Sequence, residues 1–388
     1  MSKLRDMKKI ILLSCLLAGV VACSAKVDAS RVVTLAAEQC KIMDKSLSDT
    51  RMPKTFKDGE LVTSKLSWWC SGFYPGVCWY TYKLGQDESM KELALKQTAK
   101  MLNVKALNRQ HDIGFQMQAS VMHAYDETGD SLYLPVIREA AELLASRFSP
   151  VTGTIKSWDN KRYTYPVIID NMMNLELLTY ASRLFGVPEW KEVAITHART
   201  TMKNHFRDDY SSYHVVDYNP EDGSIIAKKT HQGYADESAW ARGQAWGLYG
   251  FTMMFRETGE EDFLRQAEGI ASFLMPKLSG RPVPAWDFDA PKESIGQDDA
   301  SAAAIMASAF LELGHLTGKK EYVNQAKTIL KALGKSKYLC TPGECGGFIL
   351  KHSTGNYPKN GEVDVPLTYA DYYYMEALYR LGTLFITC

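Results

Sequence analysis

The stretch WGLYGFTMMFRETGEEDF, residues 246–263, holds the pattern that decides the fold. Its first nine residues carry no charge, so a helix that they form is apolar on all sides, as buried helices are. A glycine follows at position 259, and glycine readily adopts the left-handed conformation that ends a helix. The charged residues after it begin a second, amphipathic helix. The stretch therefore predicts a helical hairpin with one buried and one exposed helix.

The same pattern recurs along the chain, with an apolar helix end, a glycine, a short polar gap and a new helix. The other copies lie around Gly85, Gly129, Gly186 and Gly318, and a further copy begins at Gly382. Such self-similarity is typical of stacked helical hairpins. The 3.6-residue periodicity predicts about twelve helices. We expect them near residues 32–47, 73–85, 88–103, 113–128, 131–148, 169–186, 188–206, 238–258, 260–276, 299–317, 319–334 and 366–384.

These helices alternate between charged, amphipathic ones and ones whose centres are nearly free of charge. Six apolar helices enclosed by six amphipathic ones explain both kinds, which predicts an all-α fold, the (α/α)6 barrel. One short hairpin within 213–230 is the expected exception. Turns that leave the apolar helices are short and those that enter them are long, so the inner helices should run parallel with their N-termini at one rim. No Pro/Ser-rich linker interrupts the chain, which predicts a single domain over residues 32–388.

The N-terminus has the features of an export signal. A basic leader is followed by IILLSCLLAGVVAC, residues 10–23, an apolar run too short to span a bilayer. Its end resembles the lipobox of bacterial lipoproteins, so we expect a signal peptide over residues 1–22, lipidation of Cys23 and a tether over 23–31. The alternative is an ordinary signal peptide with an incidental cysteine. The lipid-anchor reading places the protein in the periplasm or cell envelope, with the membrane reached only through that anchor.

Charge and cysteine content exclude some classes of partner. The chain has 45 basic and 45 acidic residues, so no surface charge predicts nucleic-acid binding. Six cysteines follow Cys23, and an even number in an oxidising compartment permits disulfides. Cys340 and Cys345 share a loop and are the expected pair. No CxxC pair is present and few histidines lie nearby, so we expect no metal site.

Two aspartates are placed where chemistry is expected. Asp112 and Asp170 each come directly before an inner helix, on neighbouring helices at the same rim. The alternative role for each is helix N-capping, which aspartate favours. Two carboxylates that share a pocket can have pKa values pushed apart, which yields one acid and one base. A helix N-terminus favours the ionised form, whereas burial and a second carboxylate favour the protonated one.

The remaining rim residues have the composition of a carbohydrate site, rich in Trp, Tyr, His and Asp. Arg242 could bind a carboxylate with two hydrogen bonds, or it could form a structural salt bridge. His111, His214 and Gln232 are candidate hydrogen-bond donors. The candidates for stacking on sugar rings are Trp69, Trp158 and Trp246.

Five motifs together resemble the unsaturated glucuronyl hydrolases. They are WCSGFYPG, HDIGF, IIDNMMNLELL, WARGQAW and YADYYYMEAL, which occur in this order between about residues 68 and 380. The resemblance implies the (α/α)6 barrel. It also implies a reaction in which water adds across the C4=C5 bond of a 4,5-unsaturated uronic acid, at the non-reducing end of a lyase-generated oligosaccharide, so that the glycosidic bond is lost.

The resemblance also implies roles for the site residues. Asp170 matches the general acid and base, and Asp112 its partner that stabilises charge. Substrate binding is implied for Trp69, His111, Trp158, His214, Gln232, Arg242 and Trp246. No metal or organic cofactor is implied. In some family members the region of the loop 352–361 binds sulfate on the next sugar; here the spacing of Ser353 and Lys359 differs from that pattern, so the resemblance does not fix a sulfate preference.

Two other functions fit the same residues. The related unsaturated rhamnogalacturonyl hydrolases share the barrel and the hydration chemistry but act on pectin fragments. A non-catalytic glycan-binding lipoprotein would use the aromatic rim, yet it gives no reason for two carboxylates there. We therefore expect an enzyme that acts on glycosaminoglycan disaccharides. The oligomeric state is left open by the sequence.

Overall fold

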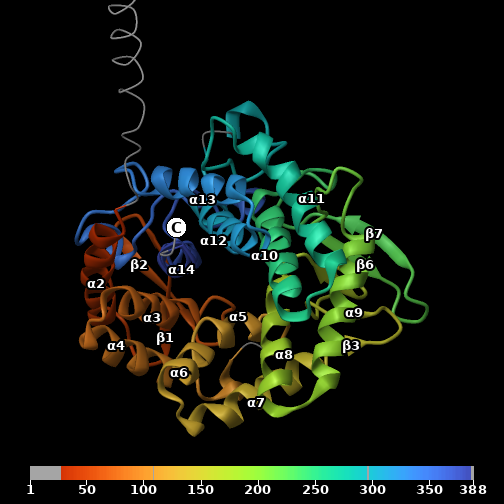
Figure 1. Ribbon diagram of the computed structural model, residues 1–388, viewed down its shortest axis with the longest axis horizontal. Helices are drawn as coiled ribbons and strands as arrows, with labels where there is room; N and C mark the ends of the chain where they lie inside the picture. The colour runs from red at the N-terminus through yellow and green to blue at the C-terminus, as the bar shows by residue number, and fades with distance from the viewer. Residues whose placement is uncertain (1–27, 108, 295–296, 386–388) are drawn as a thin grey trace, which may run out of the picture.

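The structure is a computed structural model that describes residues 28–107, 109–294 and 297–385. The predicted signal peptide and the lipidation site at Cys23 lie outside the described residues. Twelve helical segments form two concentric sets, with each predicted inner helix inside the ring and each predicted outer helix around it (Figure 1). The inner helices are α3 (Phe73–Gly85), α5 (Ile113–Gln118) continued by α6 (Val121–Thr128), α8 (Asn171–Phe185), α10 (Ala241–Thr258), α12 (Ala300–Thr317) and α14 (Thr368–Leu384).

Contacts between the inner helices run from each one to the next. The α3 helix packs on α6, α5 on α8, α8 on α10, α10 on α12 and α12 on α14, and α14 contacts α3. Most of the outer helices pack directly on the inner helix that adjoins them in the chain. The outer helices are α2 (Ala29–Lys45), α4 (Glu88–Ala99), α7 (Leu134–Ala145), α9 (Pro188–Asn204), α11 (Glu261–Leu278) and α13 (Lys320–Leu333).

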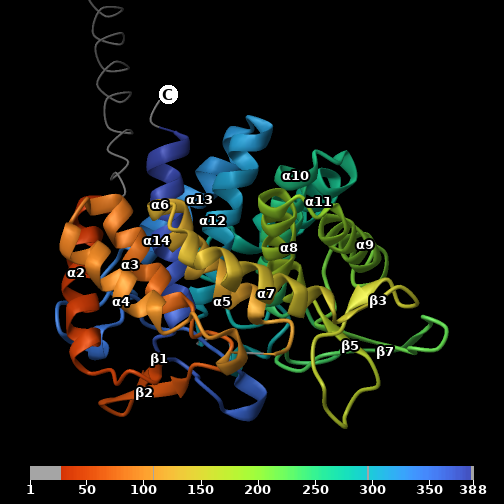
Figure 2. The ribbon, with the colours of Figure 1, turned by 90° about the horizontal axis from the view of Figure 1, so that it is seen from below.

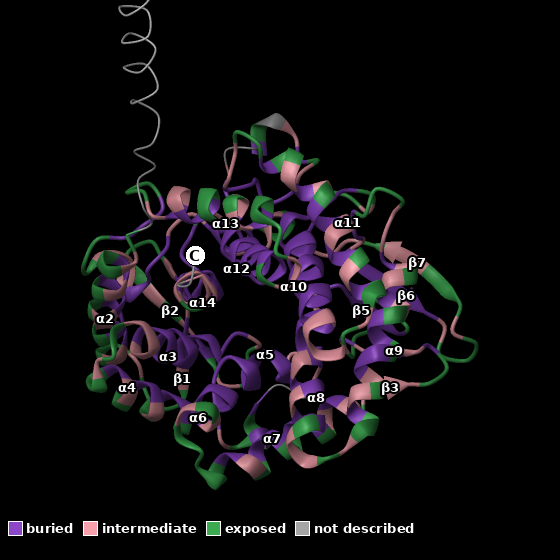
Figure 3. Cartoon of the chain, viewed as in Figure 1, coloured by how far each residue is buried: buried purple, intermediate pink, exposed green. Residues whose placement is uncertain are grey.

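Burial follows the predicted division between the two sets. Inner helices are buried over most of their length, whereas outer helices alternate between buried and exposed residues (Figure 3). The α12 helix is buried from Ala300 to Gly314. It is the one helix among the described residues that is long and apolar enough to cross a membrane, and 83% of that window is buried within the protein. Its apolar composition is therefore explained by its place in the core.

Two predicted helices are interrupted. The helix expected over 113–128 breaks at Ser120, whose φ and ψ of −137° and −79° are not helical. Its hydroxyl donates to the carbonyl of Gln116 at 2.5 Å, a local bond with which serine competes against regular helix geometry. The helix expected over 131–148 begins with a 3-10 turn, η2 (Ser131–Tyr133), because Pro135 occupies the first turn of α7 and supplies no N–H there.

The described part of the chain is mostly helical but contains three small sheets, so the all-α prediction is wrong in that detail. The hairpin expected within 213–230 is present as β6 (Val215–Tyr218) and β7 (Ile225–Lys229), and β5 (Pro166–Ile168) joins its other edge. A second hairpin consists of β1 (Arg51–Lys57) and β2 (Glu60–Lys65). A third, minimal pair consists of β3 (Phe148–Ser149) and β4 (Thr154–Ile155).

The sheets and long loops gather towards one end of the ring. Figure 2 shows β1, β2, β5 and β7 at the end opposite to the C-terminus. The remaining short elements are 3-10 turns, namely η1 (Val104–Ala106), η3 (Lys292–Ser294), η4 (Glu344–Gly347) and η5 (Tyr357–Lys359). The long connections into the inner helices therefore build one elaborate end of the molecule.

The disulfide expected between Cys340 and Cys345 is not formed. All five described cysteines after Cys23 are free thiols, and Cys388 lies outside the described residues. The thiols of Cys340 and Cys345 do lie together, since a hydrogen bond between them lowers the pKa of Cys345. The shared loop thus brings the two sulfur atoms into contact, as their spacing predicted, without a covalent bond.

Candidate active site

A cavity of about 410 Å³ opens at the end where the inner helices begin. Asp112 and Asp170 both line it, with Arg242 from the first turn of α10 and Tyr369 from the first turn of α14. The two carboxylates that sequence placed on neighbouring helices therefore face one space. Their side chains are 14% and 13% exposed, so each is nearly withdrawn from water yet reachable from the cavity.

Neither aspartate acts as a helix cap. Asp112 and Asp170 occupy the N-cap positions of α5 and α8, but neither side chain accepts a hydrogen bond from the helix that follows. Asp299 offers a contrast, because its side chain accepts from the backbone N–H groups of Ser301 and Ala302 at the start of α12. The capping alternative is thus excluded for the two cavity aspartates, whose carboxylates point elsewhere.

Burial dominates the electrostatics of Asp170. It raises the pKa of this carboxyl to about 7, while the positive charge of Arg242 and the indole N–H of Trp246 act in the opposite direction. One carboxylate oxygen, Oδ2, has no hydrogen-bond partner among the described residues. Of the competing effects that the sequence left open, burial therefore prevails, and the group is shared between its protonated and ionised forms near neutral pH.

Strand pairing places His214 beside Asp170. In β5 and β6, Ile168 pairs with Val215, and the backbone N–H of Ile169 donates to the carbonyl of His214. The imidazole Nε2 then lies 3.8 Å from Oδ2 of Asp170. Its Nδ1 accepts from the backbone N–H groups of residues 231 and 232, at 3.1 and 3.2 Å. Because burial holds the pKa of His214 well below 6.5, the ring is neutral and its single N–H is on Nε2, towards the carboxyl.

A second histidine stands in the same relation to Asp112. The Nε2 atom of His111 lies 3.3 Å from Oδ1 of Asp112. Burial, reinforced by the charge of Arg147, lowers the pKa of His111 to about 3, so this ring is neutral as well. Both histidines are buried behind the aspartates rather than lining the cavity. The structure therefore places both histidines against the carboxylates and not in the cavity wall, whereas the sequence predicted that they bind the substrate.

Arg242 is held largely by the protein itself. Its guanidinium donates to the carbonyls of Thr354 and Gly355 at 2.6 and 2.7 Å and forms a buried ion pair with Asp299 at 3.3 Å. Gln232 also donates to the carbonyl of Gly355, at 2.9 Å. Both residues line the cavity, yet the structural salt bridge considered for Arg242 is present. Together they fix the C-terminal loop as one wall of the site.

The three predicted aromatic platforms have different positions. Trp69 and Trp158 line the cavity and are partly exposed, as a surface for stacking requires. Trp246 does not reach it; the ring is fully buried between Phe115 and Tyr373. Its predicted role as a stacking platform is therefore wrong, because both faces of the ring are covered. Its indole N–H instead acts to lower the pKa of Asp170.

Several cavity residues escaped the sequence reasoning. Lys54 from β1 and Glu362 from the C-terminal loop form an ion pair at 3.1 Å, and Lys54 lies over the ring of Trp68, 4.7 Å from its centroid. Lys359 lies 3.1 Å from the ring of His231. The full set that sequence missed is Lys54, Trp68, Ile168, His231, Gly355, Asn356, Gly361, Glu362 and Tyr369. In the described ranges, no group of three or more His, Cys, Asp or Glu side chains could hold a metal ion.

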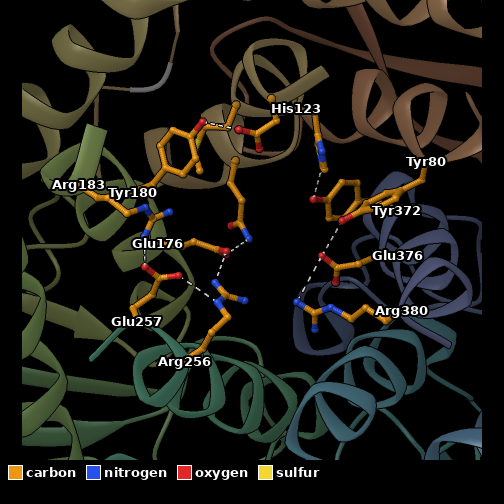
Figure 4. Close-up of a pocket in the computed structure, with 13 residues that line it drawn as sticks. Tyr80, His123, Glu176, Tyr180, Arg183, Arg256, Glu257, Tyr372, Glu376 and Arg380 are labelled. Carbon is orange, nitrogen blue, oxygen red and sulfur yellow. Dashed lines mark hydrogen bonds and ion pairs between the residues drawn. The ribbon is translucent and has the colours of Figure 1, made fainter. Parts of the chain in front are cut away.

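A different polar cavity, of about 280 Å³, lies near the C-terminal ends of the inner helices (Figure 4). Most of its charges are paired. Arg256 contacts Glu176, Glu257 and Glu312, and Arg380 contacts Glu312 and Glu376. This network joins α8, α10, α12 and α14 at the end away from the two aspartates. The paired charges indicate a structural role for the far end.

Comparison with known proteins gives a consistent picture. The model of Glycosyl Hydrolase Family 88 matches residues 42–276. The chain is 43% identical over 323 residues to an unsaturated glucuronyl hydrolase from Formosa agariphila, covering 82% of this chain and 81% of that relative. It is 31% identical over 368 residues to an unsaturated chondroitin disaccharide hydrolase from Streptococcus pyogenes, covering 91% of both. A crystal structure of an unsaturated glucuronyl hydrolase specific for heparin superimposes with a TM-score of 0.88 at 43% identity, over 91% of this chain and 96% of that one.

Proposed function

Because the chain belongs to Glycosyl Hydrolase Family 88, we propose that it removes the 4,5-unsaturated uronic acid from the non-reducing end of lyase-generated oligosaccharides. The reaction is hydration of the C4=C5 double bond. We infer further that the ring of inner and outer helices is an (α/α)6 barrel, which the unbroken circuit of contacts from α3 round to α14 supports.

One observation carries the proposal. Asp112 and Asp170 line the same cavity, with neutral histidines behind them and with Trp69 and Trp158 as partly exposed aromatic faces. Aromatic rings stack on the CH faces of sugars, and two carboxyl groups can divide the work of proton transfer and charge stabilisation. A pure binding site would need the aromatic rings but would have no use for a carboxyl group poised near neutral pH.

The chemistry assigns one role to each aspartate. Asp170, with its pKa of about 7, is protonated in a large fraction of molecules and can deliver that proton to C4. The resulting positive charge at C5 is shared with the ring oxygen, and the side chain of Asp112 stabilises it. Water then adds at C5 and gives up a proton to the Asp170 carboxylate. The product is a hemiketal, which opens and releases the next sugar without attack at the anomeric carbon.

We assign glycosaminoglycan disaccharides as the substrate class. The relatives include enzymes named for chondroitin disaccharides and for heparin. The cavity of this chain is lined by Lys359 and by Lys54, which pairs with Glu362, and Arg162 lies 3.4 Å from His231, which itself lines the cavity. These cations suit a substrate with a carboxylate and sulfate groups.

A panel of unsaturated disaccharides tests the function. The purified protein is incubated with chondroitin-type, heparin-type and pectin-type disaccharides, and loss of the ultraviolet absorbance of the double bond is followed. We expect loss with at least one glycosaminoglycan disaccharide. Activity confined to the pectin disaccharide would assign the unsaturated rhamnogalacturonyl reaction instead. Binding to any of them without turnover would make the protein a glycan-binding one.

We propose that the protein is a lipoprotein of the cell envelope, anchored through Cys23. The support is the sequence alone, a basic leader and a short apolar run that ends in VVAC at residues 20–23. Labelling with a radioactive fatty acid should mark the wild-type protein and not the Cys23→Ala variant. Equal labelling of both, or a wild-type protein that stays in the cytoplasm, would contradict the anchor.

A further inference from the structure

The two aspartates lie on separate helices, and one side chain connects those helices at the site. Asn174 lies one turn after Asp170 on α8 and is fully buried. Its Oδ1 accepts the backbone N–H of Phe115 in α5 at 2.8 Å, and its Nδ2 lies 3.3 Å from Nδ1 of His111. Asn174 thus connects α8, which begins directly after Asp170, to His111, the residue beside Asp112.

The orientation of this amide follows from its partners. A backbone N–H can only donate, so the Asn174 atom that faces Phe115 must be the oxygen. The NH₂ group must then face His111, and because it can only donate, Nδ1 of the neutral ring must accept. The ring N–H is consequently on Nε2, which lies 3.3 Å from Oδ1 of Asp112.

We infer that Asn174 is a positioning residue of the hydration reaction, whose amide fixes the tautomer of His111 so that the ring proton is on Nε2, the nitrogen that lies 3.3 Å from Oδ1 of Asp112. This inference rests on the proposed function for its catalytic meaning. The Asp170 side of the site reaches the same arrangement by another route, since backbone N–H groups after β7 fix the tautomer of His214. Each of the two carboxyl groups therefore has a neutral histidine beside it with the proton on Nε2, at 3.3 Å from Asp112 and 3.8 Å from Asp170, and neither nitrogen has a hydrogen-bond partner among the described residues.

Close helix packing explains why an asparagine serves here. A Cβ atom on Gly114 would lie 2.5 Å from Oδ1 and 2.6 Å from Cα of Asn174, so α5 and α8 touch at this point. A longer side chain would not fit, and an apolar one would leave both the Phe115 N–H and the His111 Nδ1 without a partner. Such buried, unpaired groups are costly, so the amide serves both structure and tautomer.

Several groups around His111 affect its protonation in addition to Asn174. Burial lowers the pKa of His111, as do the charges of Arg147 and His197, whereas the side chain of Asn171 raises it. In Asn174→Asp a carboxylate would face Nδ1 and demand a proton there. The neutral ring would then turn its Nε2 lone pair towards Asp112, and only the doubly protonated ring would restore the Nε2–H.

The experiment measures the tautomer and the kinetics separately. The ¹⁵N shifts of His111, identified by the signal lost in His111→Gln, are recorded for the ligand-free wild type, Asn174→Ser and Asn174→Asp. We expect a bare Nδ1 in the wild type and a protonated Nδ1 in Asn174→Asp. With an unsaturated chondroitin disaccharide, kcat should fall about 100-fold in both variants with little change in KM. In Asn174→Asp the remaining kcat should shift towards acidic pH.

Thr179→Val is the matched control, because Thr179 is a buried polar residue on the same helix whose hydroxyl donates to the carbonyl of Glu176, within that helix. It should keep wild-type kinetics and pH profile. A wild-type His111 with its proton on Nδ1, or an Asn174→Asp variant with unchanged kcat and pH profile, overturns the inference. If the wild type turns over no unsaturated disaccharide, the proposed function fails, while the ¹⁵N shifts still decide the tautomer. If Asn174→Asp does not fold, Asn174→Ser carries the kinetic test.

Discussion

Among single residues, Asp170 matters most, because burial raises the pKa of its carboxyl group. Its pKa of about 7 makes it the proton donor, so Asp170→Asn should lower kcat by about 10²–10⁴-fold, the usual contribution of a general acid. Binding of the disaccharide should persist, because the amide keeps the shape of the carboxyl. Steady-state kinetics together with calorimetric binding measure both. Turnover at the wild-type rate would remove Asp170 from the reaction.

The same shift predicts how stability depends on pH. The pKa of Asp170 is higher in the folded protein than its ordinary value of 3.8, so the folded state binds the proton more tightly. The contribution of Asp170 to the free energy of unfolding should therefore decrease as the pH rises from about 4 to about 7. Asp170→Asn removes this loss, and its melting temperature relative to the wild type should increase over that range.

Asp298 supplies a control of opposite sign. Bonds from Lys337, Tyr338 and Arg281 hold its pKa below the ordinary value, so its stabilisation is present above that value and lost as the pH falls. Asp298→Asn should thus be less stable than the wild type at neutral pH, and the gap should close in acid. Melting curves of the two variants at pH 8, at pH 4 and at a pH well below 3.8 that change in parallel would contradict this account of Asp170.

For Asp112 the structure separates chemistry from capping. The side chain accepts no hydrogen bond from the first turn of α5, so Asp112→Asn should remain folded at room temperature while its turnover drops. Circular dichroism and the disaccharide assay check the two halves of the prediction. An unfolded variant would mean that the carboxylate stabilises the helix start after all.

At the scale of elements, the meeting of α5 and α8 decides whether the two carboxyl groups share a cavity. Gly114→Ala would insert a methyl group against Asn174 and should cost about 1–3 kcal/mol in the free energy of unfolding, with loss of activity. Gly382→Ala in the last turn of α14 is the control, because nothing lies within 4 Å of its added Cβ. Equal effects of the two substitutions in urea unfolding would contradict the close packing.

The helices were predictable and parts of the cavity were not. The 3.6-residue period and the repeated glycines located every inner and outer helix, because an apolar or amphipathic stripe is a local property. The β1–β2 hairpin was missed, although Asp58 and Gly59, both with positive φ, supply a recognised turn signal. Lys54 was missed with the hairpin, because it lies in β1. Its ion pair with Glu362 joins segments some 300 residues apart, so no local sequence pattern predicts it.

Aromatic residues show the same limit. Trp246 and Trp69 look alike in the sequence, each near an inner helix start, yet Trp246 is enclosed by Phe115 and Tyr373 and Trp69 is partly open. Which of two indoles faces a cavity depends on partners from distant helices. Sequence therefore located the rim and its aspartates but could not say which neighbours support the carboxyl groups from behind.

At the scale of the whole molecule, the two ends of the ring have different tasks. The end shown in Figure 4 is held by paired charges, in which Arg256 bridges Glu176 on α8 and Glu312 on α12. Arg256→Met would leave Glu176 without an ion-pair partner and Glu312 with Arg380 alone, and it should lower the free energy of unfolding by about 3 kcal/mol. The activity of the folded fraction should not change, since the active cavity lies at the other end.

Arg183→Met serves as the comparison in urea unfolding. Arg183 also lines this cavity and pairs with Glu257, but its side chain is 64% exposed, so its loss should cost well under 1 kcal/mol. Equal destabilisation by the two variants would contradict a buried network as the support of the far end.

Proton NMR of the reaction in D₂O shows whether the two aspartates in one cavity hydrate a double bond. If the account is correct, the vinyl H4 signal and the anomeric signal of the unsaturated sugar disappear together, deuterium enters at C4, and Asp170→Asn shows neither change. Release of the next sugar while the uronic acid keeps its vinyl signal would mean direct attack at the anomeric carbon and would contradict the mechanism.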